Sequence, residues 1–143
     1  MNREAIYGAL WANVSSAAGL VLTSRRLRHF GDLSPAQMPA LFMQQRRETP
    51  TNTKTGLPLE YVFEVALFLY VHAGEDPNAV PAPIINGLVD AVLATLAGNV
   101  MDSAQTLGGL VHYCRQQGSI EIEEGWAGNV AIVMIPIEIM APA

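Results

Sequence analysis

The sequence has few of the residues from which chemical sites are usually built. Of its 143 residues only one is cysteine, Cys114, and three are histidine. A single thiol excludes an intramolecular disulfide and an ordinary zinc cluster. His29, His72 and His112 are scattered along the chain and lack the i, i+4 spacing of a helix-borne metal pair. We therefore expect neither a metal nor another cofactor.

Charged residues and long hydrophobic runs are also scarce. Charged side chains make up 15% of the chain and hydrophobic ones 50%, which excludes disorder as its main state and suits one domain over residues 1–143. The longest apolar stretch, 130–137, is interrupted by Pro136 and is far shorter than the roughly 20 residues of a membrane span. Glu4 places an acid among the first four residues, and no run of seven or more purely apolar residues follows it, so no secretory signal is visible. We expect no membrane association and no export, and a reducing cytoplasm suits the single thiol.

No pattern typical of an active site is present. The only Gly-Gly pair, Gly108-Gly109, precedes a predicted strand, whereas a phosphate cradle opens a helix. His112 and Cys114 are two residues apart in an alternating segment, and the strand spacing of about 7 Å exceeds a hydrogen bond. The acids of 120–124 alternate with apolar residues, as on a solvated strand face. We therefore predict that Cys114 is a core residue and that the protein is not an enzyme.

The apolar periodicity that is present predicts an α+β protein. Helical spacing occupies 4–18 and 84–96. Extended patterns occupy 20–24, 41–45, 59–72, 110–124 with a turn or bulge at 117–118, and 129–140. Ser34 and Gln37 flank Pro35 and predict a single helical turn. The expected order is α-β-β-β-α-β-β, a two-layer sandwich with a mostly antiparallel sheet of about five strands and two helices.

The segment 59–72 gives the strongest strand signal and is apolar on both faces. Such a strand lies in the middle of its sheet, or a neighbouring subunit covers its second face. On the second alternative, the candidate subunit interface is the even-numbered face, with Val62, Glu64, Phe68 and Tyr70.

Two further segments carry specific expectations. Residues 49–58 have no apolar period and are rich in Thr, Asn, Gly and Pro, which predicts a flexible loop containing Thr49, Thr51, Asn52, Lys54 and Gly56. Pro136 lies inside the last strand, and because proline cannot donate to a ladder, we expect a sheet edge or a bulge there.

The net charge of −5 is unevenly distributed along the chain. Residues 1–54 contain seven basic residues against three acids, whereas 55–143 contain one against ten. Two surfaces of opposite charge would favour head-to-tail association of identical copies, unless interleaved strands mix the two halves in space. The basic residues are candidates for contact with a partner or DNA, or they are solvated and paired with acids such as Glu48; they are Arg25, Arg26, Arg28, Arg46, Arg47 and Lys54. The negative total argues against autonomous binding to duplex DNA.

Three stretches of the chain resemble one family. SRRLRHFGDLSPAQMPALFMQQ (24–45), QTLGGLVHYC (105–114) and IPIEIM (135–140) resemble the tail terminator proteins of long-tailed bacteriophages, the group similar to minor tail protein U. The resemblance implies the order α-β-X-β-β-α-β-β, with the turn near Ser34 at X. It also implies a structural protein of the virion tail, assembled in the host cytoplasm. As a ring, usually a hexamer, it would cap the tail tube, stop polymerisation and join the head connector, with DNA passing through the bore.

Two alternatives remain open at this point. A neck or head-completion protein of the same phage module would share the composition and the ring, and would differ only in its partner. A small-molecule binding domain would need a deep polar pocket, for which the sequence supplies no convergent residues.

Overall fold

The computed structural model describes residues 1–52, 54–98 and 104–143 and has an α+β fold, as the sequence predicts. The helices are α1 (Arg3–Val14) and α2 (Ala82–Ala94). Two 3-10 turns, η1 (Phe30–Asp32) and η2 (Pro35–Gln37), precede the second strand. The strands are β1 (Leu22–Ser24), β2 (Ala40–Thr51), β3 (Glu60–His72), β4 (Tyr113–Gln116), β5 (Glu121–Ala127) and β6 (Val130–Pro142).

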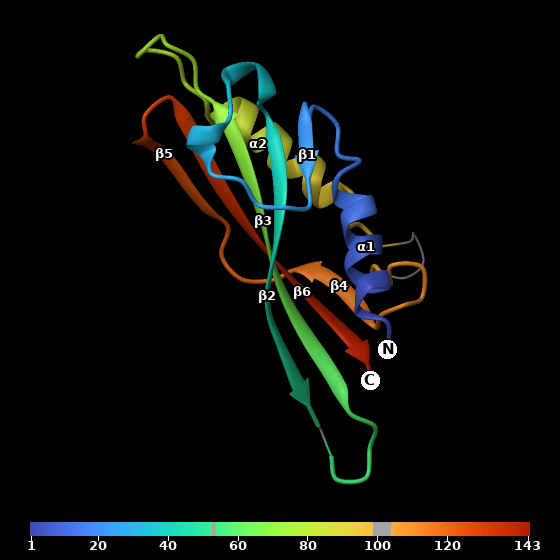
Figure 1. Cartoon of the computed structure of the whole chain (residues 1–143). Coiled ribbons are helices and arrows are strands. Elements are labelled where there is room, and N and C mark those ends of the chain that lie inside the picture. The colour runs from blue at the N-terminus through green and yellow to red at the C-terminus, as the bar shows by residue number, and fades with distance from the viewer. Residues whose placement is uncertain (53, 99–103) are drawn as a thin grey trace.

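All six strands form one sheet in the order β1-β2-β3-β6-β4, with β5 also paired to β6 (Figure 1). Only the β1–β2 pairing is parallel. β3 is central, flanked by β2 and β6 over its whole length, which accounts for its apolar character on both faces. The extended unit expected at 110–124 forms two strands, so the sheet has one strand more than the pattern indicated.

The main core lies between the sheet and the two helices. The odd-numbered residues of β3 and β6 face this side, and Leu67, Leu69 and Ile135 are completely buried. From α1 and α2 the buried contacts include Leu10 and Val92. Cys114 is also part of this cluster, as predicted.

The opposite face of the sheet, which we call the helix-free face, is covered only in part. Residues 25–39 cross it at one end and enclose a second core cluster around Phe42 and Tyr70 (Figure 1). The Tyr70 hydroxyl donates to the backbone carbonyl of Arg28 at 2.7 Å. Tyr70, a candidate for contact with another subunit, is only 5% exposed, because residues of its own chain cover most of it.

β2 is longer than its sequence indicates. The pattern ends near Gln45, yet β2 stays paired with β3 to Thr51 after a bulge at Arg46. Glu48 holds this part of β2 to α1, because it accepts hydrogen bonds from Arg3 Nε at 2.6 Å and from Tyr7 Oη at 2.9 Å.

The connection between β2 and β3 is correspondingly shorter than expected. Thr49 and Thr51 belong to β2 and not to the loop. Asn52, Lys54 and Gly56 lie in the connection, which projects beyond the end of the sheet (Figure 1), and Thr53 lies outside the described residues.

Pro136 lies in β6, which is an interior strand and not the sheet edge that was one of the two expectations. β4 pairs with residues 137–140 of β6 and β5 with residues 130–134, so the neighbouring strand is broken opposite Pro136. Gln117 donates its N–H to the Pro136 carbonyl at 3.2 Å. Because the N and C=O of a strand residue face the same neighbour, the missing N–H of Pro136 points into this break and leaves no acceptor unpaired.

Gly118 in this break is predicted to be intolerant of a side chain. Its φ is +97°, and an added Cβ would lie 3.3 Å from Pro136 Cγ. Gly118→Ala should lower the free energy of unfolding by about 1–2 kcal/mol. Gly87→Ala is the matched control in α2, where a Cβ meets nothing within 4 Å, and should raise it by about 0.5–1 kcal/mol. Urea denaturation measures both, and effects of the same sign would contradict this account.

Candidate assembly surface

The part of the helix-free face that residues 25–39 leave open contains two adjoining hollows. The first, which we call the Phe68 hollow, has a volume of about 370 Å³. Its floor is apolar and consists of Phe68, Tyr70, Ile132 and Met134. Arg46 of β2 lies on one side of the floor, and Glu121 and Glu123 of β5 lie on the other. The hollow therefore presents apolar surface between a cation and a pair of carboxylates.

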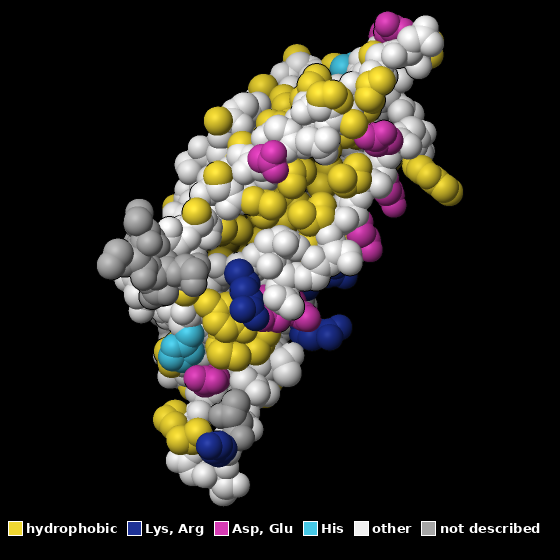
Figure 2. All heavy atoms as spheres, turned by 180° about the vertical axis from the view of Figure 1, so that it is seen from behind, with side chains coloured by type: hydrophobic (Ala, Val, Ile, Leu, Met, Phe, Trp, Pro, Cys, Tyr) yellow, Lys and Arg dark blue, Asp and Glu magenta, His cyan; other side chains and the backbone are white. Residues whose placement is uncertain are grey.

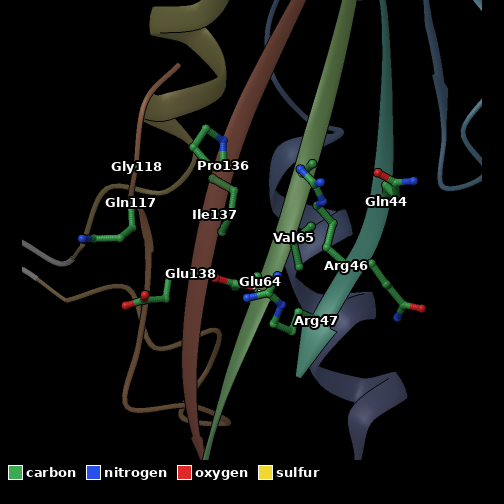
Figure 3. A pocket seen from close by; sticks show the side chains of 12 residues that line it. Gln44, Arg46, Arg47, Glu64, Val65, Gln117, Gly118, Pro136, Ile137 and Glu138 are labelled. Carbon is green, nitrogen blue, oxygen red and sulfur yellow. Dashed lines mark ion pairs between the residues drawn. The ribbon is translucent and has the colours of Figure 1, made fainter. Parts of the chain in front are cut away.

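The second hollow, of about 630 Å³, is crossed by a row of charged side chains (Figure 3). Glu64 of β3 stands directly opposite Glu138 of β6. Like charges in such a cross-strand pair repel each other. Each carboxylate has its own cation, because Arg47 Nε lies 3.3 Å from Glu64 Oε2 and Arg115 Nη2 lies 3.5 Å from Glu138 Oε1. The row is thus neutral as a whole, and Glu64 is engaged within its own chain.

The six predicted basic residues do not converge on one patch. Arg25 pairs with Glu4 of α1, which lowers the pKa of that carboxyl, and Arg47 pairs with Glu64. Within the described part of the chain, Arg26, Arg28 and Arg46 make no ion pair. Lys54 lies on the β2–β3 loop, away from the arginines in the fold. Glu48, the acid suggested as a partner for them, is bound by Arg3 instead.

The candidate interface residues of β3 differ in accessibility. Val62 and Phe68 are half-buried and Glu64 is exposed, whereas Tyr70 is buried. Of the four, Phe68 and Tyr70 line the Phe68 hollow, and Phe68 is the more exposed of these two.

Charge is distributed along the length of the molecule. Viewed from the helix side (Figure 2), Lys and Arg side chains are confined to the half that ends in the β2–β3 loop. Asp and Glu side chains occur in both halves and line one edge of the other half. On this face, the separation of charge seen along the sequence becomes a partial separation between the two ends.

Of the residues that were considered for catalysis, Cys114 belongs to the main core, and Glu121 and Glu123 line the Phe68 hollow. Cys114 is 1% exposed, and burial raises its pKa to about 12. His112 pairs with Glu60 at 3.1 Å. In the described ranges, no three His, Cys, Asp or Glu side chains are grouped as metal ligands would be. The acids of β5 are exposed, as the alternation predicted.

One exposed aromatic residue was missed by the sequence analysis. Trp126 precedes the turn between β5 and β6 and is 89% exposed. The signal available in the sequence was a large apolar residue beside two turn glycines, Gly125 and Gly128.

Comparison with known proteins gives a fold relationship. No protein-family model matches the sequence, and no curated protein matches it. Among solved structures, the chain is similar to one from the virion of a native gene transfer agent particle, with a TM-score of 0.56 at 9% sequence identity. The match covers 95% of this chain and 93% of that chain. The two chains share a fold over nearly their whole lengths.

The helices α1 and α2 are too short to span a membrane. Neither helix within the described residues has the length and apolarity needed to cross a bilayer.

The burial of Cys114 predicts that its thiol is unreactive in the folded protein. Alkylation by iodoacetamide at pH 8 should be at least about 100-fold slower than in urea, because the reactive thiolate is suppressed and screened. Val80→Cys, at a position 70% exposed, is the control and should react rapidly. Fast labelling of Cys114 in native buffer would show that this core opens.

The raised pKa of Cys114 also predicts that the free energy of unfolding falls at high pH. A thiol in the unfolded chain ionises near pH 8.5, whereas Cys114 in the folded chain does so near 12. Between these values the unfolded state has lost a proton that the folded state keeps, so the free energy of unfolding falls as pH rises. Cys114→Ala should reduce this slope in urea titrations between pH 8 and 11. An unchanged slope would contradict it.

Proposed function

We propose that this chain is a structural component of a phage-like particle and acts as its tail terminator. In this role it forms a ring, a hexamer, that caps the tail tube, stops polymerisation and joins the head connector. The observation that carries the proposal is the fold shared with a chain of a gene transfer agent virion over 95% of this chain. The sequence resemblance to tail terminators points independently to the same kind of particle, and it supplies the position in the tail.

The described surface supports assembly. The Phe68 hollow is apolar and open, and unpaired charges stand on both of its sides. Self-association would bury this surface against another copy. A small domain with 50% hydrophobic residues is stabilised when such exposed apolar surface is removed from water. Arg26, Arg28 and Arg46 are free to meet the partner proteins or DNA in passage through the bore, and in a ring they recur once per subunit.

Ring formation and capping provide the direct test. Light scattering across concentration should give a hexamer, and electron microscopy should show rings. When added to polymerising tube protein of the same particle, the chain should bind one tube end and shorten the tubes. Rings that bind only the head connector would favour a neck or head-completion protein. If neither rings nor binding to a tube or connector occurs, the proposal fails.

A substitution on the Phe68 hollow should separate folding from assembly. Phe68→Glu places a charge at a half-buried, open position, so the monomer should fold with a melting temperature close to that of the wild type but fail to form the ring. Phe42→Glu, on the same face but completely buried, should unfold the protein. Thermal melting and sizing distinguish the two. Normal rings from Phe68→Glu would remove this hollow from the subunit contact.

A further inference from the structure

The tip of the β2–β3 loop contains a turn that carries basic and apolar side chains. Leu57 donates its N–H to the Lys54 carbonyl at 3.2 Å, and Gly56 has the positive φ of +87° that a tight turn requires. The loop is anchored at its base, where Ala143 donates to the Leu59 carbonyl at 3.1 Å. The turn presents Lys54 and leaves Leu57 and Leu59 50% and 39% exposed.

The Phe68 hollow has complementary properties. Its floor is apolar, and Glu121 and Glu123 on one side outnumber Arg46 on the other. Neither carboxylate forms an ion pair with any described residue. A lysine followed by two leucines, Leu57 and Leu59, therefore matches the hollow in charge and in polarity.

The loop cannot reach the hollow of its own chain. Phe68 lies eight residues along β3 from Glu60, where the loop ends, and a strand rises about 3.3 Å per residue, so the two are roughly 26 Å apart. The loop also points away from the sheet (Figure 1). A match between two distant parts of one chain can be satisfied only by a second copy, in a head-to-tail contact that closes into a ring or continues as a filament.

We propose that residues 54–59 of one copy dock into the Phe68 hollow of the next copy. Lys54 meets Glu121 and Glu123, and Leu57 covers the apolar floor near Phe68 and Met134. This inference rests on the proposed function for the closure of the ring, and it deepens that function by identifying the two surfaces that meet. It also gives the next copy, and not the tail tube, as the partner of the loop.

Disulfide trapping tests the contact directly. The variant Leu57→Cys/Met134→Cys carries both halves of the contact, while the native Cys114 is buried. Under mild oxidation it should give a covalent ladder on denaturing gels that ends at the ring size. Leu57→Cys/Ile84→Cys, with Ile84 58% exposed on α2 and so on the other side of the sheet, is the control. It should cross-link at least about tenfold less. Equal cross-linking of the two variants, or none from the first, overturns the proposal.

Charge exchange provides a second test that does not depend on a thiol. Lys54→Glu alone, and Glu121→Lys/Glu123→Lys alone, should each raise the concentration for half-assembly at least about tenfold. All three positions are exposed, so unchanged melting temperatures are expected. The triple variant restores opposite charges and should recover assembly to within about threefold of the wild type. Independent, additive losses in the triple variant would overturn the contact.

The outcomes separate this inference from the proposed function. Copies that trap at 57–134 but do not cap tubes leave the contact standing and remove the terminator role. If the rings cap tubes but the trapping pair gives no cross-link and the charge variants assemble normally, the terminator role stands and the contact is removed. If Lys54→Glu abolishes capping without affecting rings, the loop binds the tube and the contact between copies is wrong. A wild-type chain that stays monomeric, together with a Leu57→Cys/Met134→Cys variant that forms no cross-link, overturns the contact.

Discussion

The structure depends on the need to cover both faces of β3. This strand is apolar on its two sides, and Leu67 and Leu69 on one face and Ala66 on the other are completely buried. Burial of apolar area is the main favourable term in folding, so each exposed stretch of β3 would cost stability. The helices cover one face in full. The other face is covered by residues 25–39 at one end only, and the hollow at Phe68 begins where that cover ends.

Polar interactions link α1 to β2 and neutralise charges on the helix-free face. Glu48 ties α1 to the distal part of β2 through Arg3 and Tyr7, and burial raises the pKa of Tyr7, which therefore stays a hydrogen-bond donor. Across the helix-free face, two arginines neutralise the facing carboxylates Glu64 and Glu138. These contacts engage most charges near the sheet within one chain. Arg46, Glu121 and Glu123 form no ion pair with a described residue, and they stand around the apolar floor of the Phe68 hollow.

Local sequence patterns predicted the elements whose stabilisation is local or one-sided. The period of α2, the alternation of β3 and the Ser34-Pro35 turn all appear where expected, and Ser34 N–H donates to Gln37 Oε1 at 2.9 Å. The same patterns failed for the second half of β2. Residues 46–51 are exposed or nearly so, and only their hydrogen bonds to β3 make them a strand, so no apolar period could reveal them. Pairing of this kind is determined by the partner strand, which a pattern read along one segment does not include.

By itself, the sequence determined the α+β class, the apolar character of β3 on both faces and the burial of Cys114. Each of these follows from composition or from periodicity within one segment. Only the tertiary structure decided that residues 25–39 bury Tyr70, that Arg25 and Arg47 are paired, and that Phe68 lies between Arg46 and the acids of β5. These features join residues that are 17 positions apart, as for Arg47 and Glu64, to 77 positions apart, as for Arg46 and Glu123. Their energies come from contacts that exist only after the sheet has assembled, and the spacing of residues along the sequence does not encode them.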